Sequence, residues 1–69
     1  MIEYKEIASY ENNRYSLVLV EVWEYPCTKY YAMTGKDNET GKRVDYTGTW
    51  RDSMVEDFKR IAAAMGKTV

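Results

Sequence analysis

The stretch YSLVLVEVWEY, residues 15–25, decides the fold because it is apolar on both faces of an extended chain. Successive side chains of a strand point to opposite sides of the sheet. The apolar residues therefore form two sets: the valine side, made of Val18, Val20 and Val22, and the leucine side, made of Leu17, Leu19 and Trp23. A strand that is apolar on both sides needs a covering layer on each of them.

Length and composition predict a single soluble domain over residues 1–69. A chain of this size buries only about 60% of the surface that its unfolded form exposes, so the core is small. The chain has one cysteine, Cys27, and no histidine, which leaves association with a second subunit as the means of strengthening that core. A lone thiol and the absence of a long apolar run predict a cytoplasmic protein with no membrane partner.

Turn signals divide the first two-thirds of the chain into four strands. Alternating and β-branched runs predict strands at residues 2–8, 15–25, 29–36 and 42–47. The turns between them are assigned to Asn12 and Asn13, to Pro26, and to the run from Asp37 to Gly41. Gly41 is expected to take the left-handed conformation. Consecutive strands joined by short turns predict an antiparallel meander.

After Gly48 the apolar period changes from two to 3.6, which predicts a helix. Its apolar side consists of Trp50, Met54, Val55, Phe58, Ile61, Ala62 and Met65. Thr49 and Asp52 resemble a capping box at its start, and Gly66 is expected to cap its end. The predicted fold class is therefore α+β, a four-stranded antiparallel meander with one C-terminal helix packed on one face, in the order ββββα.

The register of the hairpins decides which side chains share a face of the sheet. A tight turn at residues 25–28 pairs Val22 with Tyr31, and the next turn pairs Met33 with Tyr46. One face then collects Val18, Val20, Val22, Tyr31, Met33, Val44 and Tyr46. This aliphatic face is predicted to take the helix, because the helix offers side chains of complementary shape.

The opposite face is predicted to be exposed. It collects Leu17, Leu19, Trp23, Tyr30, Lys36, Arg43 and Asp45. The first hairpin leaves two alternatives open: a three-residue loop adds Ile2 and Tyr4 to the covered side, and a two-residue loop does not.

Catalysis is not predicted. No histidine is present for a Ser/His or Cys/His pair, and Glu21 and Glu24 point to opposite sides of one strand. Cys27 is interpreted as a turn residue without chemistry, so a Cys27→Ala substitution is expected to leave function intact. No cofactor and no metal ion are expected.

One segment of the chain resembles a known family. The run GKDNETGKR, residues 35–43, is followed by a short strand, then by Thr49 and Trp50 and the helix. Over roughly residues 30–62 this order resembles the small AP2-like DNA-binding domains at the N-termini of phage and transposon integrases. The resemblance implies a sheet face that enters the major groove, with these DNA contacts: Tyr30, Thr34, Lys36 and Arg43. The chain departs from that family in lacking a basic excess, since its net charge is −1.

In size and style the chain is also similar to small phage-encoded inhibitors of host machinery, such as anti-CRISPR proteins. Aromatic anchors with a polar rim are typical of binding hot spots. The predicted function is therefore a non-catalytic protein-binding module whose exposed sheet face takes a protein partner or a second copy of the chain. Its binding residues are predicted to be Leu17, Leu19, Trp23, Tyr30, Lys36, Arg43 and Asp45. The alternative is a DNA-binding module that uses the same face, which is less favoured because acidic neighbours offset the basic residues.

Overall fold

The computed structural model describes residues 1–25 and 28–67, which form four strands followed by one helix. The elements are β1 (Ile2–Glu11), β2 (Tyr15–Glu24), β3 (Thr28–Asp37), β4 (Arg43–Gly48) and α1 (Arg51–Lys67). Neighbouring strands pair antiparallel in the order β1-β2-β3-β4, so the predicted α+β fold with ββββα order is confirmed. Pro26 and Cys27, on which the predicted β2–β3 turn and its thiol fall, lie outside the described residues.

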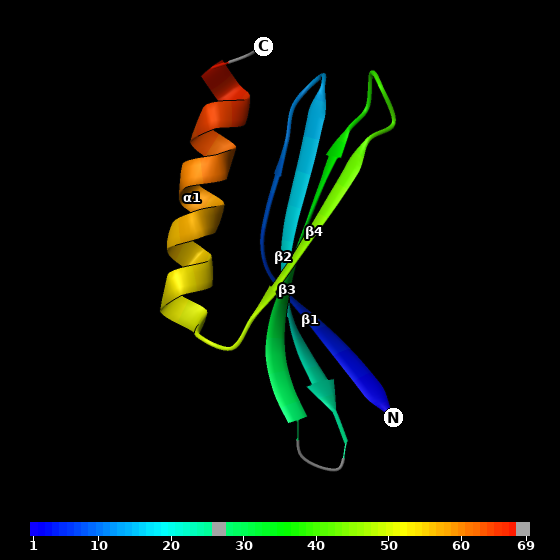
Figure 1. Ribbon diagram of the computed structural model, residues 1–69, viewed down its shortest axis with the longest axis vertical. Coiled ribbons are helices and arrows are strands. Elements are labelled where there is room, and N and C mark those ends of the chain that lie inside the picture. The colour runs from blue at the N-terminus through cyan, green and yellow to red at the C-terminus, as the bar shows by residue number, and fades with distance from the viewer. Residues whose placement is uncertain (26–27, 68–69) are drawn as a thin grey trace.

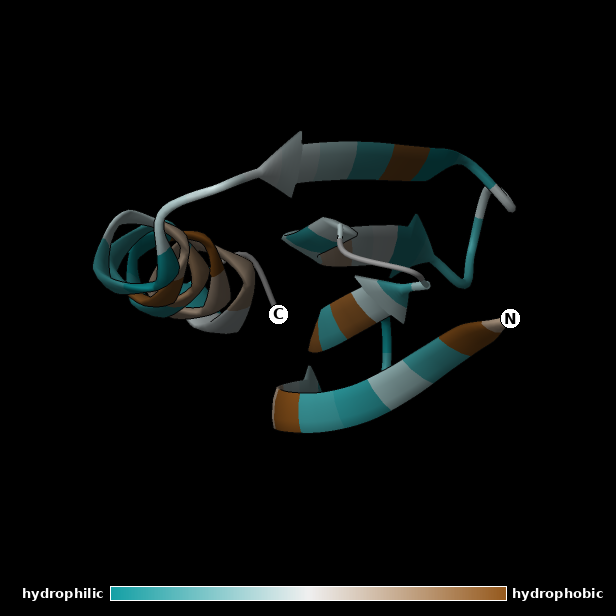
Figure 2. Ribbon diagram, turned by 90° about the horizontal axis from the view of Figure 1, so that it is seen from below, coloured by the Kyte–Doolittle hydropathy of each residue, from teal (hydrophilic) through white to brown (hydrophobic). Residues whose placement is uncertain are grey.

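The helix packs on the leucine side of β2. Figure 1 shows α1 alongside the half of the sheet that carries the β1–β2 and β3–β4 turns, and Figure 2 shows it on one side of the four stacked strands. The buried core consists of Leu17, Leu19, Tyr31, Met33, Met54 and Phe58. Leu19 is 0% exposed, and burying a leucine contributes about 1.5–3 kcal/mol. The prediction that the helix covers the valine side is therefore wrong.

A one-residue difference in the β2–β3 register explains this correction. Val22 pairs with Tyr30 rather than with Tyr31. The β3–β4 register agrees with the prediction, since Met33 pairs with Tyr46. Because side chains alternate along a strand, a shift of one residue moves every side chain of β2 to the other face relative to β3 and β4.

The pairing of β1 with β2 changes register at Ile7, which is the extra residue of a β-bulge. Ile7 is partly buried and packs against the core cluster. On the N-terminal side of the bulge, Tyr4 pairs with Val22, so Tyr4 and Ile2 share the valine side of the sheet. The bulge thus allows β1 to place apolar side chains on both faces.

Hydrogen bonds tie the β1–β2 turn to the β3–β4 turn. Asn12 Oδ1 accepts bonds from the backbone N–H groups of Arg14 at 2.9 Å and Tyr15 at 2.7 Å. Arg14 Nη2 donates to Asp37 Oδ2 at 3.3 Å, which joins the two turns. Gly41 has a φ of 77°, so the predicted left-handed glycine is confirmed.

The surroundings of Asp37 favour its charged form. Desolvation raises the pKa of Asp37, but the hydrogen bond from Arg14, the backbone N–H groups of Glu39 and Thr40, and the charge of Arg14 together lower it by more, so the pKa lies below its usual value. The same hydrogen bond to Asp37, followed by charge attraction, raises the pKa of Arg14. This ion pair stabilises the end of the sheet that carries both turns.

The two ends of α1 differ from the prediction. The helix begins at Arg51, and the carbonyl of Trp50 accepts a bond from the Met54 N–H at 3.1 Å, so Trp50 occupies the N-cap position. The side chain of Thr49 makes no hydrogen bond to another described residue. The helix also continues through Gly66, whose φ is not positive, so this glycine is not the predicted cap.

Candidate functional site

Within residues 1–25 and 28–67, α1 covers one broad face of the sheet and no helix covers the other, which we name the open face. Its side chains are Ile2, Tyr4, Glu6, Ser9 and Glu11 from β1, Ser16, Val18, Val20, Val22 and Glu24 from β2, Thr28, Tyr30, Ala32, Thr34 and Lys36 from β3, and Arg43, Asp45 and Thr47 from β4. The register arranges these side chains in rows across the strands. The valine side of β2 lies at the centre.

The centre of the open face is apolar. Val22 is only 1% exposed because it pairs with Tyr4 on one side and Tyr30 on the other, and larger neighbours in a row shield a short side chain. Val18 and Val20 are half-buried, and Tyr4 is 69% exposed. An uncovered apolar surface bordered by polar residues is typical of interaction sites.

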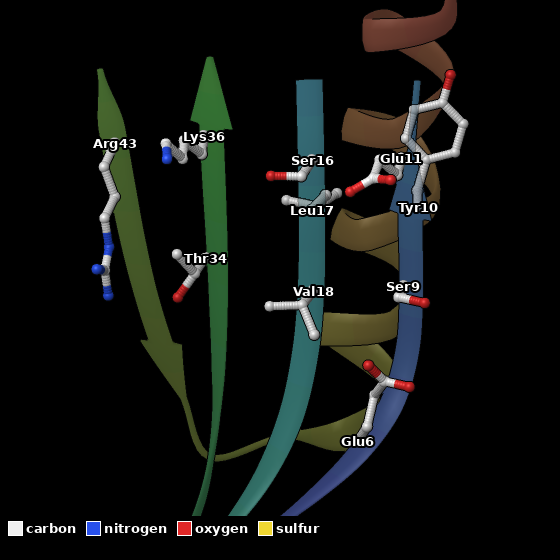
Figure 3. A pocket seen from close by; sticks show the side chains of 10 residues that line it. All are labelled: Glu6, Ser9, Tyr10, Glu11, Ser16, Leu17, Val18, Thr34, Lys36 and Arg43. Carbon is white, nitrogen blue, oxygen red and sulfur yellow. The ribbon is translucent and has the colours of Figure 1, made fainter. Parts of the chain in front are cut away.

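The open face is hollowed near the turn end of the sheet. The hollow has a volume of about 550 Å³. Figure 3 shows its arrangement: Glu6 and Glu11 project from β1 at one border, Lys36 and Arg43 lie at the other, and the small side chains Ser16, Val18 and Thr34 lie between them. Small residues form the floor and long charged residues form the borders, so the hollow suits a surface with an apolar ridge and charged flanks.

The two borders of the hollow carry opposite charges. Arg43 Nε lies 3.3 Å from Asp45 Oδ1, which makes an exposed ion pair within β4. Neither Glu11 nor Lys36 forms an ion pair with any residue in the part of the chain that the structure describes. They lie on the same row with β2 between them, so their charges are available to a partner.

Four of the seven predicted binding residues lie together on the open face: Tyr30, Lys36, Arg43 and Asp45. Lys36 pairs directly with Arg43, and Asp45 pairs with Thr34. The predicted β3 and β4 residues thus share one face, where Lys36 and Arg43 line the hollow and Tyr30 lies six residues away along β3.

The other three predicted residues lie on the helix-covered face. Leu17 and Leu19 are core residues beneath α1, so their prediction as exposed binding residues is wrong. Trp23 is 39% exposed, its Nε1 donates a hydrogen bond to Glu21, and the Lys29 Nζ lies 5.0 Å from its ring centroid. Trp23 is therefore separated from the open face and already engaged by its neighbours.

Sequence reasoning missed the β1 and β2 residues of the open face, chiefly Tyr4, Glu11 and the three valines. One sequence signal for the correct β2–β3 register is Gly35, which pairs with Leu17. The Leu17 Cδ1 is 3.4 Å from the position that a Cβ on Gly35 would take, so a long side chain fills the space beside the glycine. A valine at that place would fill it less well.

The chemical groups of the open face are suited to recognition by charge, hydrogen bonding and apolar contact. Within residues 1–25 and 28–67, no cluster of acidic, histidine or cysteine side chains could hold a metal ion. No described helix is long and apolar enough to cross a membrane.

A second hollow, of about 270 Å³, lies on the helix side of the sheet between α1 and β4. Its lining includes Val44 and Tyr46 from β4 and Ile61 from α1. It exists because α1 packs mainly on β2 and β3 and leaves Val44 and Tyr46 about half exposed.

In comparisons with known proteins, the chain matches no family model, no curated protein and no solved structure, so the integrase resemblance stays a prediction and function is argued from the residues themselves.

Proposed function

We propose that the protein is a non-catalytic protein-binding module that engages its partner through the open face. The observation that carries the proposal is the uncovered apolar centre of the sheet, Val18, Val20 and Val22, bordered by charged side chains on both edges. Protein interfaces have this composition, with an apolar centre and a polar rim.

A module of this kind could inhibit its partner by binding alone. A chain without histidine has few means of activating a nucleophile, so its effect on a partner comes from occupying a surface. The likeness in size and style to small phage-encoded inhibitors supports the proposal that the chain inhibits a host protein by covering its functional surface.

Site-specific photo-crosslinking tests the proposed function. A photoreactive residue in place of Ser9, which is exposed on the open face, is compared with the same residue in place of Ala63, which is exposed on α1. In cells that encode the chain, we expect protein adducts from position 9 and not from position 63. Equal adducts from both positions, or none from position 9, would contradict the proposal.

DNA binding is the second candidate function, and one observation favours it. All four contacts implied by the integrase resemblance share the open face: Tyr30, Thr34, Lys36 and Arg43. The same face also carries four carboxylates: Glu6, Glu11, Glu24 and Asp45. Because these outnumber its two basic residues, few phosphates would be neutralised.

We therefore expect weak or no binding of duplex DNA at physiological salt, measured by mobility shift. Tight binding that falls steeply with salt and is lost in a Lys36→Ala, Arg43→Ala double variant would make DNA the partner.

A further inference from the structure

We infer that the partner of the open face is a second copy of this chain, packed face to face in a dimer whose two-fold axis runs parallel to the strands. This inference rests on the proposed function, because it names the partner of the same face. The second copy would supply the layer that the valine side of β2 lacks.

Charge complementarity selects both the occupant and the axis. A two-fold axis parallel to the strands, between two stacked sheets, places β1 of one copy over β4 of the other and β2 over β3. Glu11 of each copy then faces Arg43 of the other, with Lys36 on the neighbouring strand of the same row. The Glu11–Arg43 contact therefore forms twice, once on each side of the axis, while Glu6 lies over Thr47 at the edge of the interface.

The same axis gives an apolar fit at the centre. The rows of the open face place the valines of one copy over β3 of the other in these pairs: Val18 over Thr34, Val20 over Ala32, and Val22 over Tyr30. Aligned sheets pack about 10 Å apart with their strands within about 30° of each other, which allows these rows to meet.

The other axis in the plane of the sheets, perpendicular to the strands, is less favourable. It would place the row of Glu11 over the row of Ile2 and would leave Lys36 opposite Thr28. The unpaired charges of the hollow would then be buried without partners, which costs free energy.

The area of the open face is sufficient for a reversible dimer. Three strands of ten residues and one of six, at about 3.3 Å per residue and about 4.8 Å apart, give a face of roughly 600 Å² per copy. The total of about 1,200 Å² lies at the lower end of specific protein interfaces. Dimerisation should therefore depend on concentration.

Light scattering of the full chain tests the inference. The wild-type mass is expected to rise toward twice 8.1 kDa as concentration increases. A Glu11→Lys variant, in which the new lysine would face the unchanged Arg43 of the other copy, and a Lys36→Glu, Arg43→Glu variant, in which Glu11 would face an acidic border, should each remain monomeric because like charges meet. An equimolar mixture of the two variants should recover the dimer mass, because each border then meets its opposite. Glu56→Lys, on the exposed surface of α1, is the control and should dimerise like the wild type.

A wild-type monomer at the highest soluble concentration would overturn the inference. Reversal variants that still dimerise alone, or a mixture no heavier than its components, would overturn it as well. These failures are distinct from failure of the proposed function: adducts between position 9 and a foreign protein would keep that function, whereas no adduct at position 9, to the chain itself or to any other, would remove both.

Discussion

Two adjacent residues of β2, Leu19 and Val20, have opposite environments in this fold. Leu19 lies beneath the helix, and Val20 lies half-buried on the open face. We expect Leu19→Ala to lower the free energy of unfolding by about 2–5 kcal/mol, because it leaves a cavity in the core. Val20→Ala should lower it by about 1 kcal/mol, because this side chain already contacts solvent.

Urea denaturation of dilute, monomeric protein measures both values. A larger loss for Val20→Ala than for Leu19→Ala would mean that the helix covers the valine side.

The Asp37 carboxylate makes stability depend on pH. Its pKa in the folded chain lies below the ordinary value of 3.8, so the folded state binds fewer protons than the unfolded state when the pH approaches that value. The stabilising contribution is complete above the ordinary pKa and is lost as the pH falls toward the folded one. We expect Asp37→Asn to be less stable than the wild type at neutral pH, with a smaller difference between them at about pH 2.

Urea midpoints of the two proteins across this acid range check the prediction. Asp45→Asn removes a carboxylate whose ion pair is exposed, so it serves as the control. A difference between wild type and Asp37→Asn that does not narrow in acid would contradict the role assigned to the Arg14 pair.

At the scale of elements, the start of α1 has an unsuitable residue at its N-cap. Trp50 is 77% exposed there, and a tryptophan side chain cannot accept a bond from the first free N–H groups of the helix. We expect Trp50→Asp to raise the free energy of unfolding by about 1 kcal/mol. Trp50→Ala should leave it nearly unchanged, and an equal gain in both variants, measured by urea denaturation, would show that capping is not the cause.

The sequence predicted most elements because their signals are local. The change of period after Gly48 identified α1, and the run from Asp37 to Gly41 identified the β3–β4 turn together with its register. The β2–β3 register could not be fixed in the same way. Residues 15–24 are apolar on both sides, so both registers give a plausible core, and a difference of one residue exchanges the faces.

The candidate site was predictable from the sequence for its β3 and β4 residues and not for its β1 and β2 residues. Its β3 and β4 members, such as Lys36 and Arg43, follow from the register that the sequence specifies. Its β2 members depend on the ambiguous register. Its β1 members, such as Tyr4, depend on the bulge at Ile7, which no turn residue or glycine in the sequence marks.

At the scale of the whole molecule, the described residues of this 69-residue chain form one helix for two apolar sheet faces. The helix covers the leucine side and leaves the valine side without a second layer within the described chain. A small domain gains stability when another subunit covers such a face. The open face therefore links the fold to the proposed function.

The most direct test of this account is the accessibility of leucine and valine methyl groups, measured by NMR with a soluble paramagnetic probe. The methyl groups of Leu17 and Leu19 should be protected in every sample, because α1 covers them. Those of Val18 and Val20 should be strongly relaxed in the monomeric Glu11→Lys variant and protected in the concentrated wild type. Protected valines with relaxed leucines would contradict the fold assignment, and valines equally relaxed in both samples would contradict the face-to-face dimer.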